Sequence, residues 1–365
     1  MPDHGRGEAR PHRTGGWLTT VLDILSPTTI DTKSQDYIVV DGVFHAYLYV
    51  AGYGYSTTVG SCWLAPLVEA GEGVNLSFMN ATSVKMTAAL RNGVEMPLIG
   101  LGVMHMYGSE CVRAICEAVE AGYRMIDTAA IYGNEQSVGR GIRECGADRG
   151  ELFVTTKLWV QDASYERAKQ ACETSLTNLG LEYLDLYLIH QPLGDIYGAW
   201  RAMEELLDEG KVRAIGVSNL NIGRLVDLSM HNRVTPHVSQ VEIHPFYQQD
   251  KVIREMKNLG VQPEGWSPFA EGRNDIFQNK MLSAIGKKYG KTPAQVILRW
   301  DIQRGVAVVP KSSQTRRIRE NYDIWDFELT AEDMKQIAAM DQGKELFFGH
   351  DSPEMARMFG NYRIH

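Results

Sequence analysis

The sequence predicts an α/β protein built mainly as a (β/α)8 TIM barrel. Beyond Met86, short apolar runs alternate with amphipathic stretches of helical periodicity, a pattern typical of parallel strands joined by helices. The length of 365 residues suits one such barrel, of about 250 residues or more, with an appendage. Eight strands are expected, each followed by a helix, at Leu98–Val103, Arg124–Asp127, Leu152–Lys157, Leu184–His190, Val212–Val217, Val238–Glu242, Val261–Trp266 and Val306–Pro310.

A β-hairpin is expected directly ahead of the first barrel strand. The pair Asn92-Gly93 lies between two short apolar runs within Ala88–Met96. Such a pair readily takes the positive φ angles of a two-residue hairpin turn. We expect this N-terminal hairpin to plug the floor of the barrel, which then occupies residues 86–365.

Residues 1–85 differ in character from the barrel segment. Residues 1–25 are expected to form a flexible tail, because Met1–Gly16 is polar and rich in Gly, Arg and His. Residues 26–85 are expected to form a small β-rich extension. Its strands are predicted around Asp41-Gly42, within Tyr37–Tyr53, and at Val74–Phe78.

Bulk properties exclude several classes of function. The net charge of −8 provides no global positive field that would attract nucleic acid or an anionic membrane. The five cysteines form no CxxC pair and no Cys/His zinc spacing, so we expect reduced thiols and no metal site. Apolar stretches such as Trp17–Leu25 are too short to span a bilayer. These features favour a cytoplasmic protein, and the sequence has no coiled-coil heptads that would point to assembly.

Four residues at or near the ends of the second, third and fourth predicted strands form a candidate catalytic group: Asp127, Tyr132, Lys157 and His190. Barrel active sites form at the carboxyl ends of the strands, so these side chains are expected to converge. Each alone also fits an ordinary role, as a helix cap, a packing ring, a solvated cation or a core histidine. Their joint occurrence in strand-end context favours catalysis.

These residue types fit the reduction of a carbonyl group, which needs a hydride on carbon and a proton on oxygen. Tyr132 is the natural proton donor, but a free phenol has a pKa of about 10. We expect the Lys157 ammonium to make this phenol more acidic, with Asp127 keeping the lysine charged and oriented. His190 is expected to hydrogen-bond the substrate oxygen and stabilise its developing charge.

The segments Gly122–Glu135, Phe153–Trp159 and Leu184–Pro192 resemble the aldo-keto reductases, whose tetrad is Asp, Tyr, Lys and His. The resemblance covers residues 86–365 and is strongest to a bacterial subgroup similar to diketogluconate reductases. It implies NADPH-dependent reduction of aldehydes or ketones to alcohols, with a small carbonyl compound as the substrate. By the same resemblance Trp159 walls the substrate pocket, although a role as a core aromatic residue stays open.

No Gly-x-Gly-x-x-Gly follows a predicted strand, so the usual dinucleotide-binding fold is not supported. The resemblance implies a different cofactor site, formed by the late barrel strands. It assigns Ser218, Asn219 and Gln240 to the nicotinamide amide and Trp266 to stacking on the nicotinamide ring. Ser267, which follows Trp266, is also expected to bind the cofactor. A 2′-phosphate suits Lys311, Ser312 and Arg317 at a helix N-terminus, which favours NADP(H) over NAD(H). Glu320 and Asn321 match positions that contact the adenine side of the cofactor.

Two features leave the substrate open. Gln191 stands where many relatives have Trp, and the tail after Asp341 is short, which predicts a rather open site. Small aldehydes, dicarbonyls and keto-sugars all remain compatible.

Two alternative functions also fit parts of the sequence. The barrel could serve as a nicotinamide-binding regulatory or channel-partner protein, but all four tetrad positions are filled, which favours an enzyme. Residues 26–85 resemble the N-terminus of conjugative-transfer ATPases of type IV secretion, yet residues 1–85 contain no P-loop, and the net charge argues against a DNA-transfer role. A gene fusion, a misjoined reading frame and an unrelated β-rich appendage all stay open as origins.

Overall fold

The structure, a computed structural model, describes residues 37–40, 43–50, 53–58, 86–350 and 352–364. The chain divides into two units, Met1–Ala81 and Thr82–His365.

The N-terminal unit contains a three-stranded antiparallel sheet of order β1-β2-β3. Its strands are β1 (Tyr37–Val40), β2 (Val43–Val50) and β3 (Tyr53–Thr58). Val40 pairs with Val43, so the expected strands on either side of Asp41-Gly42 are confirmed, and β3 is an additional strand. The tail at residues 1–25 and the strand at Val74–Phe78 lie outside the described residues. The resemblance of residues 26–85 to conjugative-transfer ATPases stays a prediction.

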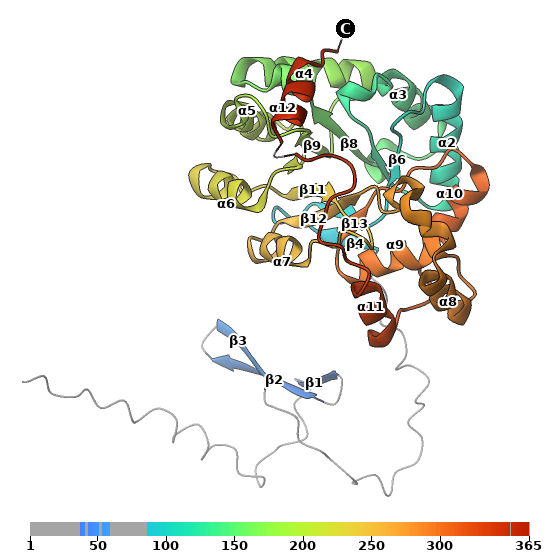
Figure 1. Cartoon of the computed structure of the whole chain (residues 1–365). Coiled ribbons are helices and arrows are strands. Elements are labelled where there is room, and N and C mark those ends of the chain that lie inside the picture. Colours follow the sequence, from blue (N-terminus) through green and yellow to red (C-terminus); the bar gives the residue numbers. More distant parts are fainter. Residues whose placement is uncertain (1–36, 41–42, 51–52, 59–85, 351, 365) are drawn as a thin grey trace, which may run out of the picture. The chain divides into compact units, whose positions relative to one another are not determined.

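The second unit is an eight-stranded parallel sheet whose strands follow one another in chain order, from β6 to β13 (Figure 1). The sheet closes on itself, because the Gly100 N–H donates to the Val308 carbonyl and the Val308 N–H donates to the Leu98 carbonyl, both at 2.9 Å. The (β/α)8 barrel is therefore confirmed. The strands are β6 (Leu101–Gly102), β7 (Met125–Asp127), β8 (Phe153–Leu158), β9 (Leu186–Ile189), β10 (Ile215–Ser218), β11 (Val238–Glu242), β12 (Gln262–Trp266) and β13 (Ala307–Val308).

Several strands are shorter than the sequence predicts. The predicted strands that begin at Leu184 and Val212 are examples. These two residues form only an isolated parallel bridge, and continuous strand pairing begins further on, between β9 and β10. An apolar run marks where side chains are buried, whereas a strand is bounded by its hydrogen bonds. The two limits therefore differ by a few residues.

Helices surround the strands (Figure 1). In the first of them, α2, Ile115 and Ala118 are fully buried on one face, and the helix ends at Gly122, whose φ of 113° suits glycine. The described α-helices are α2 (Gly108–Ala121), α3 (Glu135–Glu144), α4 (Tyr165–Leu179), α5 (Ile196–Asp208), α6 (Ile222–His231), α7 (Asp250–Asn258), α8 (Lys280–Tyr289), α9 (Pro293–Gln303), α10 (Thr315–Tyr322), α11 (Ala331–Ala338) and α12 (Pro353–Asn361). Short 3-10 helices are η2 (Ala130–Tyr132), η3 (Arg149–Glu151), η4 (Val160–Asp162) and η5 (Ala270–Gln278). None of these described helices has the length and apolar content needed to cross a bilayer.

The expected hairpin is present as β4 (Thr87–Ala89) and β5 (Glu95–Pro97). Its turn differs from the prediction: Leu90 and Val94 are hydrogen-bonded across a three-residue loop, in which Gly93 alone has positive φ, at 82°. The Asn92 amide donates to the Arg213 carbonyl at 2.8 Å, just before β10. The hairpin therefore lies at the amino ends of the barrel strands, as expected for a plug of the barrel floor.

The barrel strands are buried on both faces, because alternate side chains point to the interior and to the helices. All four residues of β9 are buried, which explains why this strand appears in the sequence as an unbroken apolar run. Several residues of the other strands are charged or polar and still buried. They include Asp127, Lys157, Gln240 and Glu264.

Candidate active site

Asp127 and Lys157 form a buried ion pair at the carboxyl ends of two adjacent strands, β7 and β8. The Lys157 Nζ lies 2.5 Å from the Asp127 Oδ1 and donates to the Thr128 carbonyl at 2.8 Å. Their exposed fractions are 0% and 4% for Lys157 and Asp127. Burial alone would lower the pKa of Lys157, but the charge of Asp127 and the nearby Tyr132 outweigh it, so the pKa is raised. Lys157 therefore stays an ammonium.

Tyr132 is placed beside this pair by the short helix η2, which ends at Gly133 with a φ of 63°. The Lys157 Nζ lies 5.4 Å from the centroid of the Tyr132 ring. Burial raises the pKa of Tyr132, Lys157 lowers it and Asp127 raises it again, with a net value above the ordinary 10. The prediction of a phenol more acidic than usual is therefore wrong, because Lys157 offsets only part of the burial. At neutral pH the phenol keeps its proton.

His190 follows β9 and faces the other two rings of the site. Its ring centroid lies 5.7 Å from that of Tyr132 and 5.4 Å from that of Trp159, each nearly edge-on. Burial, and then the charge of Lys157, hold the pKa of His190 well below 6.5. The imidazole is therefore neutral and offers one N–H and one lone pair.

The expected open site is not observed, because the tail packs across the barrel mouth. Figure 1 shows the segment between α11 and α12 crossing the barrel strands. Trp159 donates from its Nε1 to the Tyr362 carbonyl at 3.0 Å, and the Trp266 ring lies 5.4 Å from the Phe347 ring. The signal for this was the aromatic content of the tail, namely Phe347, Phe348, Phe359 and Tyr362. The aromatic rings of the tail therefore cover the barrel mouth, although the tail is short.

Three of the residues predicted to bind nicotinamide are linked to one another at the ends of β10 and β12. The Trp266 Nε1 donates to the Asn219 Oδ1 at 2.9 Å, and the Asn219 amide donates to the Ser218 Oγ at 3.0 Å and to the His190 carbonyl at 3.1 Å. Ser267 follows directly and turns the chain out of the strand with a φ of 50°. The indole plane of Trp266 is thus fixed relative to His190.

Gln240, on β11, connects the same region to the ion pair. Its Nε2 donates to the Asp127 Oδ2 and to the Glu264 Oε2, both at 3.0 Å. Glu264 was missed by the sequence analysis. The available signal was a lone carboxylate inside the apolar strand pattern Val261–Trp266.

The predicted phosphate site lies around the end of β13 and the start of α10. Lys311 and Ser312 follow β13, whereas Arg317, Glu320 and Asn321 belong to α10. Lys311 and Arg317 are exposed, and Ser312 and Asn321 are buried. The structure thus places these five residues on adjoining segments.

The arginines of α10 differ in their partners. Arg316 pairs with Glu320 at 3.9 Å, and Arg319 pairs with Glu120 at 3.2 Å. Within the described part of the chain, neither Lys311 nor Arg317 has a carboxylate within ion-pair distance. These two cations are therefore available to an anion.

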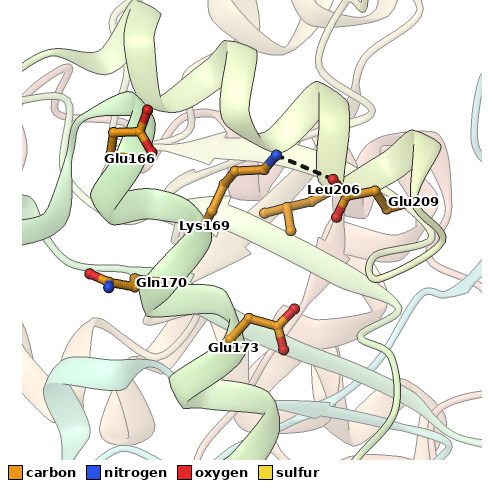
Figure 2. Close-up of a pocket in the computed structure, with 6 residues that line it drawn as sticks. All are labelled: Glu166, Lys169, Gln170, Glu173, Leu206 and Glu209. Atoms are coloured by element: carbon orange, nitrogen blue, oxygen red, sulfur yellow. Dashed lines mark hydrogen bonds and ion pairs between the residues drawn. The ribbon is translucent and has the colours of Figure 1, made fainter.

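A surface hollow of about 380 Å³ lies between α4 and α5, and Figure 2 shows its lining. Lys169 bridges the two helices by pairing with Glu205 at 2.6 Å and with Glu209 at 3.2 Å. None of the residues that line this hollow belongs to the candidate active site at the strand ends. Among residues 86–350 and 352–364, no three His, Cys, Asp or Glu side chains are grouped to hold a metal ion.

Comparison with known proteins identifies the family. Residues 98–342 match the model of the aldo/keto reductase family. The chain is 48% identical over 267 residues to the glyoxal reductase of Bacillus subtilis, covering 73% of this chain and 96% of that protein. It is 43% identical over 270 residues to the methylglyoxal reductase DkgA of Escherichia coli K12, covering 73% and 96% respectively.

A solved structure agrees with the sequence matches. The Bombyx mori aldo-keto reductase, determined in complex with NADP, superposes with a TM-score of 0.69 at 34% identity, covering 73% of this chain and 95% of that chain. The family match spans the barrel and all four strand-end residues. The chain is therefore an oxidoreductase that belongs to the aldo/keto reductase family.

Proposed function

We propose that this protein uses NADPH to reduce small aldehydes or ketones to alcohols, with Tyr132 as the proton donor. The observation that carries the proposal is the fully buried Lys157–Asp127 ion pair beside Tyr132 and His190. Burying two charges is costly, so such a pair placed at a barrel mouth indicates a functional role rather than a stabilising one.

The chain's residues fit a nicotinamide cofactor. Bound NADPH would supply the hydride for the carbonyl carbon. Gln240 presents its amide beside the ion pair, and Ser218 and Asn219 present a hydroxyl and an amide at the carboxyl end of β10. Trp266 presents an aromatic ring held by its bond to Asn219. Lys311 and Arg317 suit the 2′-phosphate that distinguishes NADP from NAD, with Glu320 and Asn321 toward the adenine. The NADP complex of the Bombyx mori relative supports this assignment.

The four strand-end residues divide the work on the carbonyl oxygen. Tyr132 holds a proton at neutral pH and gives it to the oxygen. Lys157 stays charged and stabilises the phenolate that this transfer leaves, and Asp127 keeps Lys157 charged and in place. The neutral His190 hydrogen-bonds the oxygen without competing as an acid. General acid catalysis of this kind contributes about 10²- to 10⁴-fold in rate.

The proposed substrates are small dicarbonyls. The glyoxal and methylglyoxal reductases among the relatives support this class. Trp159 and the tail rings give the site apolar walls close to His190, which favours compact substrates. We expect the enzyme to act on them as a cytoplasmic monomer.

The test is a steady-state assay of NADPH oxidation with glyoxal, methylglyoxal, a simple monoaldehyde and a keto-sugar, repeated with NADH. We expect turnover with NADPH, fastest for the dicarbonyls, and at least about tenfold weaker use of NADH, because the charge-assisted contacts of Lys311 and Arg317 to the 2′-phosphate are lost. Binding of NADPH without turnover of any carbonyl compound would contradict the proposal and favour a nicotinamide-binding regulatory protein.

A further inference from the structure

We propose that Glu264 is a positioning residue for the nicotinamide: together with Asp127 it fixes which way the Gln240 side-chain amide faces. Gln240 then presents its oxygen, and not its NH2 group, to the cofactor. The inference rests on the proposed use of NADPH and adds a residue to the machinery that orients it.

The arrangement is a buried amide held between two carboxyl groups. Gln240 and Glu264 are register partners on the adjacent strands β11 and β12, and Asp127 ends β7 across the barrel. The Gln240 Nε2 donates to both carboxyl groups at 3.0 Å. Gln240 is 3% exposed and Glu264 is fully buried, so water does not compete for these bonds.

Two acceptors are needed to fix the amide. An amide nitrogen carries two hydrogens, and Asp127 takes one of them while its other oxygen accepts from Lys157. Glu264 takes the second. If the amide were rotated by half a turn, its oxygen would face the Asp127 carboxylate, which only accepts, and two lone pairs would meet in a dry interior.

The consequence is that the Gln240 Oε1 is the polar atom left for a ligand. That atom accepts hydrogen bonds, and the carboxamide of nicotinamide carries an NH2 group that donates them. A fixed acceptor on β11 therefore selects one orientation of the carboxamide, and with it the ring face that lies toward His190 and Tyr132.

Glu264 performs this role without adding a full charge beside the ion pair. Burial, and then the charge of Asp127, raise the pKa of Glu264, whereas Lys157 and the bond from Gln240 lower it, so that the net pKa is about 8. Ala307, its register partner on β13, does not titrate. Near neutral pH Glu264 is therefore mostly uncharged, and Glu264→Gln is a close substitute because its amide oxygen still accepts from Gln240.

The test measures NADPH and adenosine 2′,5′-bisphosphate binding by calorimetry in the natural chain, Glu264→Leu and Glu264→Gln. The bisphosphate has the adenine and 2′-phosphate but no nicotinamide. We expect Glu264→Leu to weaken NADPH binding by about tenfold, because one buried hydrogen bond is lost, while bisphosphate binding is unchanged. In Glu264→Gln the Kd of each ligand should stay within about threefold of the value in the natural chain.

The hydride readout separates positioning from general damage. With NADPH deuterated at one C4 position, the natural chain and Glu264→Gln should transfer from a single face, and Glu264→Leu should lose part of this selectivity. Unchanged NADPH affinity and selectivity in Glu264→Leu, or equal weakening of both ligands, would overturn the inference. Failure of the proposed function would appear instead in the natural chain, as no NADPH binding or no turnover.

A second measurement needs no substituted chain. In the natural protein, the two side-chain NH2 hydrogens of Gln240 should give separate NMR signals that exchange slowly with water, since both are bonded in the barrel interior. Rapid exchange or a single averaged signal would contradict a fixed amide.

Discussion

Burial sets the protonation states of the titratable side chains in this site. Tyr132 keeps its proton, His190 stays neutral, and Lys157 stays charged because Asp127, and then Tyr132, outweigh the effect of its burial. Each state matches a role in reduction: a donor that holds a proton, a neutral hydrogen-bonding ring, and a cation that favours the phenolate.

Replacing Arg317 by Ala is expected to weaken NADP(H) binding by about tenfold or more, because a charge-assisted contact to phosphate is lost. NAD(H) binding should change little, since NAD lacks the 2′-phosphate. Calorimetric titration of both cofactors measures this. Arg316→Ala is the matched control, because Arg316 already pairs with Glu320. Equal weakening of NADP(H) and NAD(H) would refute a phosphate-binding role.

The tetrad was visible in the sequence because its members lie where apolar strand patterns end. The net pKa of Tyr132 was not, because it depends on how much protein covers the ring. Glu264 escaped for a related reason: one carboxylate in a strand means little until the structure shows Gln240 and Asp127 beside it.

The elements around the site pack closely through glycines. α3 lies against α4, and a methyl group at Gly139 would meet the backbone carbonyl of Leu179 at the end of α4. A backbone atom cannot swing aside as a flexible side chain does. The two helices therefore depend on the missing side chain for their separation.

Gly139→Ala is expected to lower the free energy of unfolding by about 1–3 kcal/mol through overpacking. In an open helix the same change would instead stabilise by up to about 1 kcal/mol. Urea unfolding followed by circular dichroism measures the difference. Gly150→Ala is the control, because nothing lies within 4 Å of its added methyl group, and it should change stability by less than about 0.5 kcal/mol. A stabilised Gly139→Ala would show that α3 and α4 adjust freely.

All eight barrel strands and the hairpin were predicted from the sequence, because short runs with apolar residues alternate along the chain with amphipathic helical stretches. Their exact bounds, and the three-residue loop at Gly93, depend on backbone hydrogen bonds that a hydrophobic pattern does not record. The expectation of an open site was wrong because it considered only the length of the tail, whereas the aromatic rings of the tail pack against Trp159 and Trp266.

At the scale of the whole molecule, the barrel unit contains its own hairpin plug and closes its own sheet. The family match lies within it, at residues 98–342. We therefore expect a chain lacking residues 1–85 to keep its kcat/KM for NADPH and methylglyoxal within about twofold, as is usual for changes outside a domain's own core. Loss of folding or activity on this deletion would show that the extension is part of the enzyme.

Stability should depend on pH through Asp301, a fully buried residue of α9. Burial raises the pKa of this carboxyl and Arg304 offsets only part of that shift, so that the net pKa is about 8. Between the ordinary pKa of 3.8 and about 8, the unfolded chain releases a proton that the folded chain keeps, so this group makes stability fall as pH rises.

Asp301→Asn removes that linkage and keeps an acceptor for Arg304. The free energy of unfolding of Asp301→Asn, relative to that of the natural protein, should increase by more than about 1 kcal/mol when the pH is raised from about 5 to about 8. One pKa unit corresponds to about 1.4 kcal/mol. Urea unfolding at both pH values measures the gain. A stability difference that does not change with pH would mean that Asp301 is ionised in the folded protein.

The central claim is that Tyr132 gives the proton, and Tyr132→Phe tests it most directly because it removes one hydroxyl and keeps the ring. The measurement is kcat for methylglyoxal reduction together with the Kd of NADPH, in the natural protein and the variant. We predict that kcat falls by about 10²- to 10⁴-fold while the Kd stays within about threefold. Full turnover by Tyr132→Phe, with NADPH bound normally, would contradict the account.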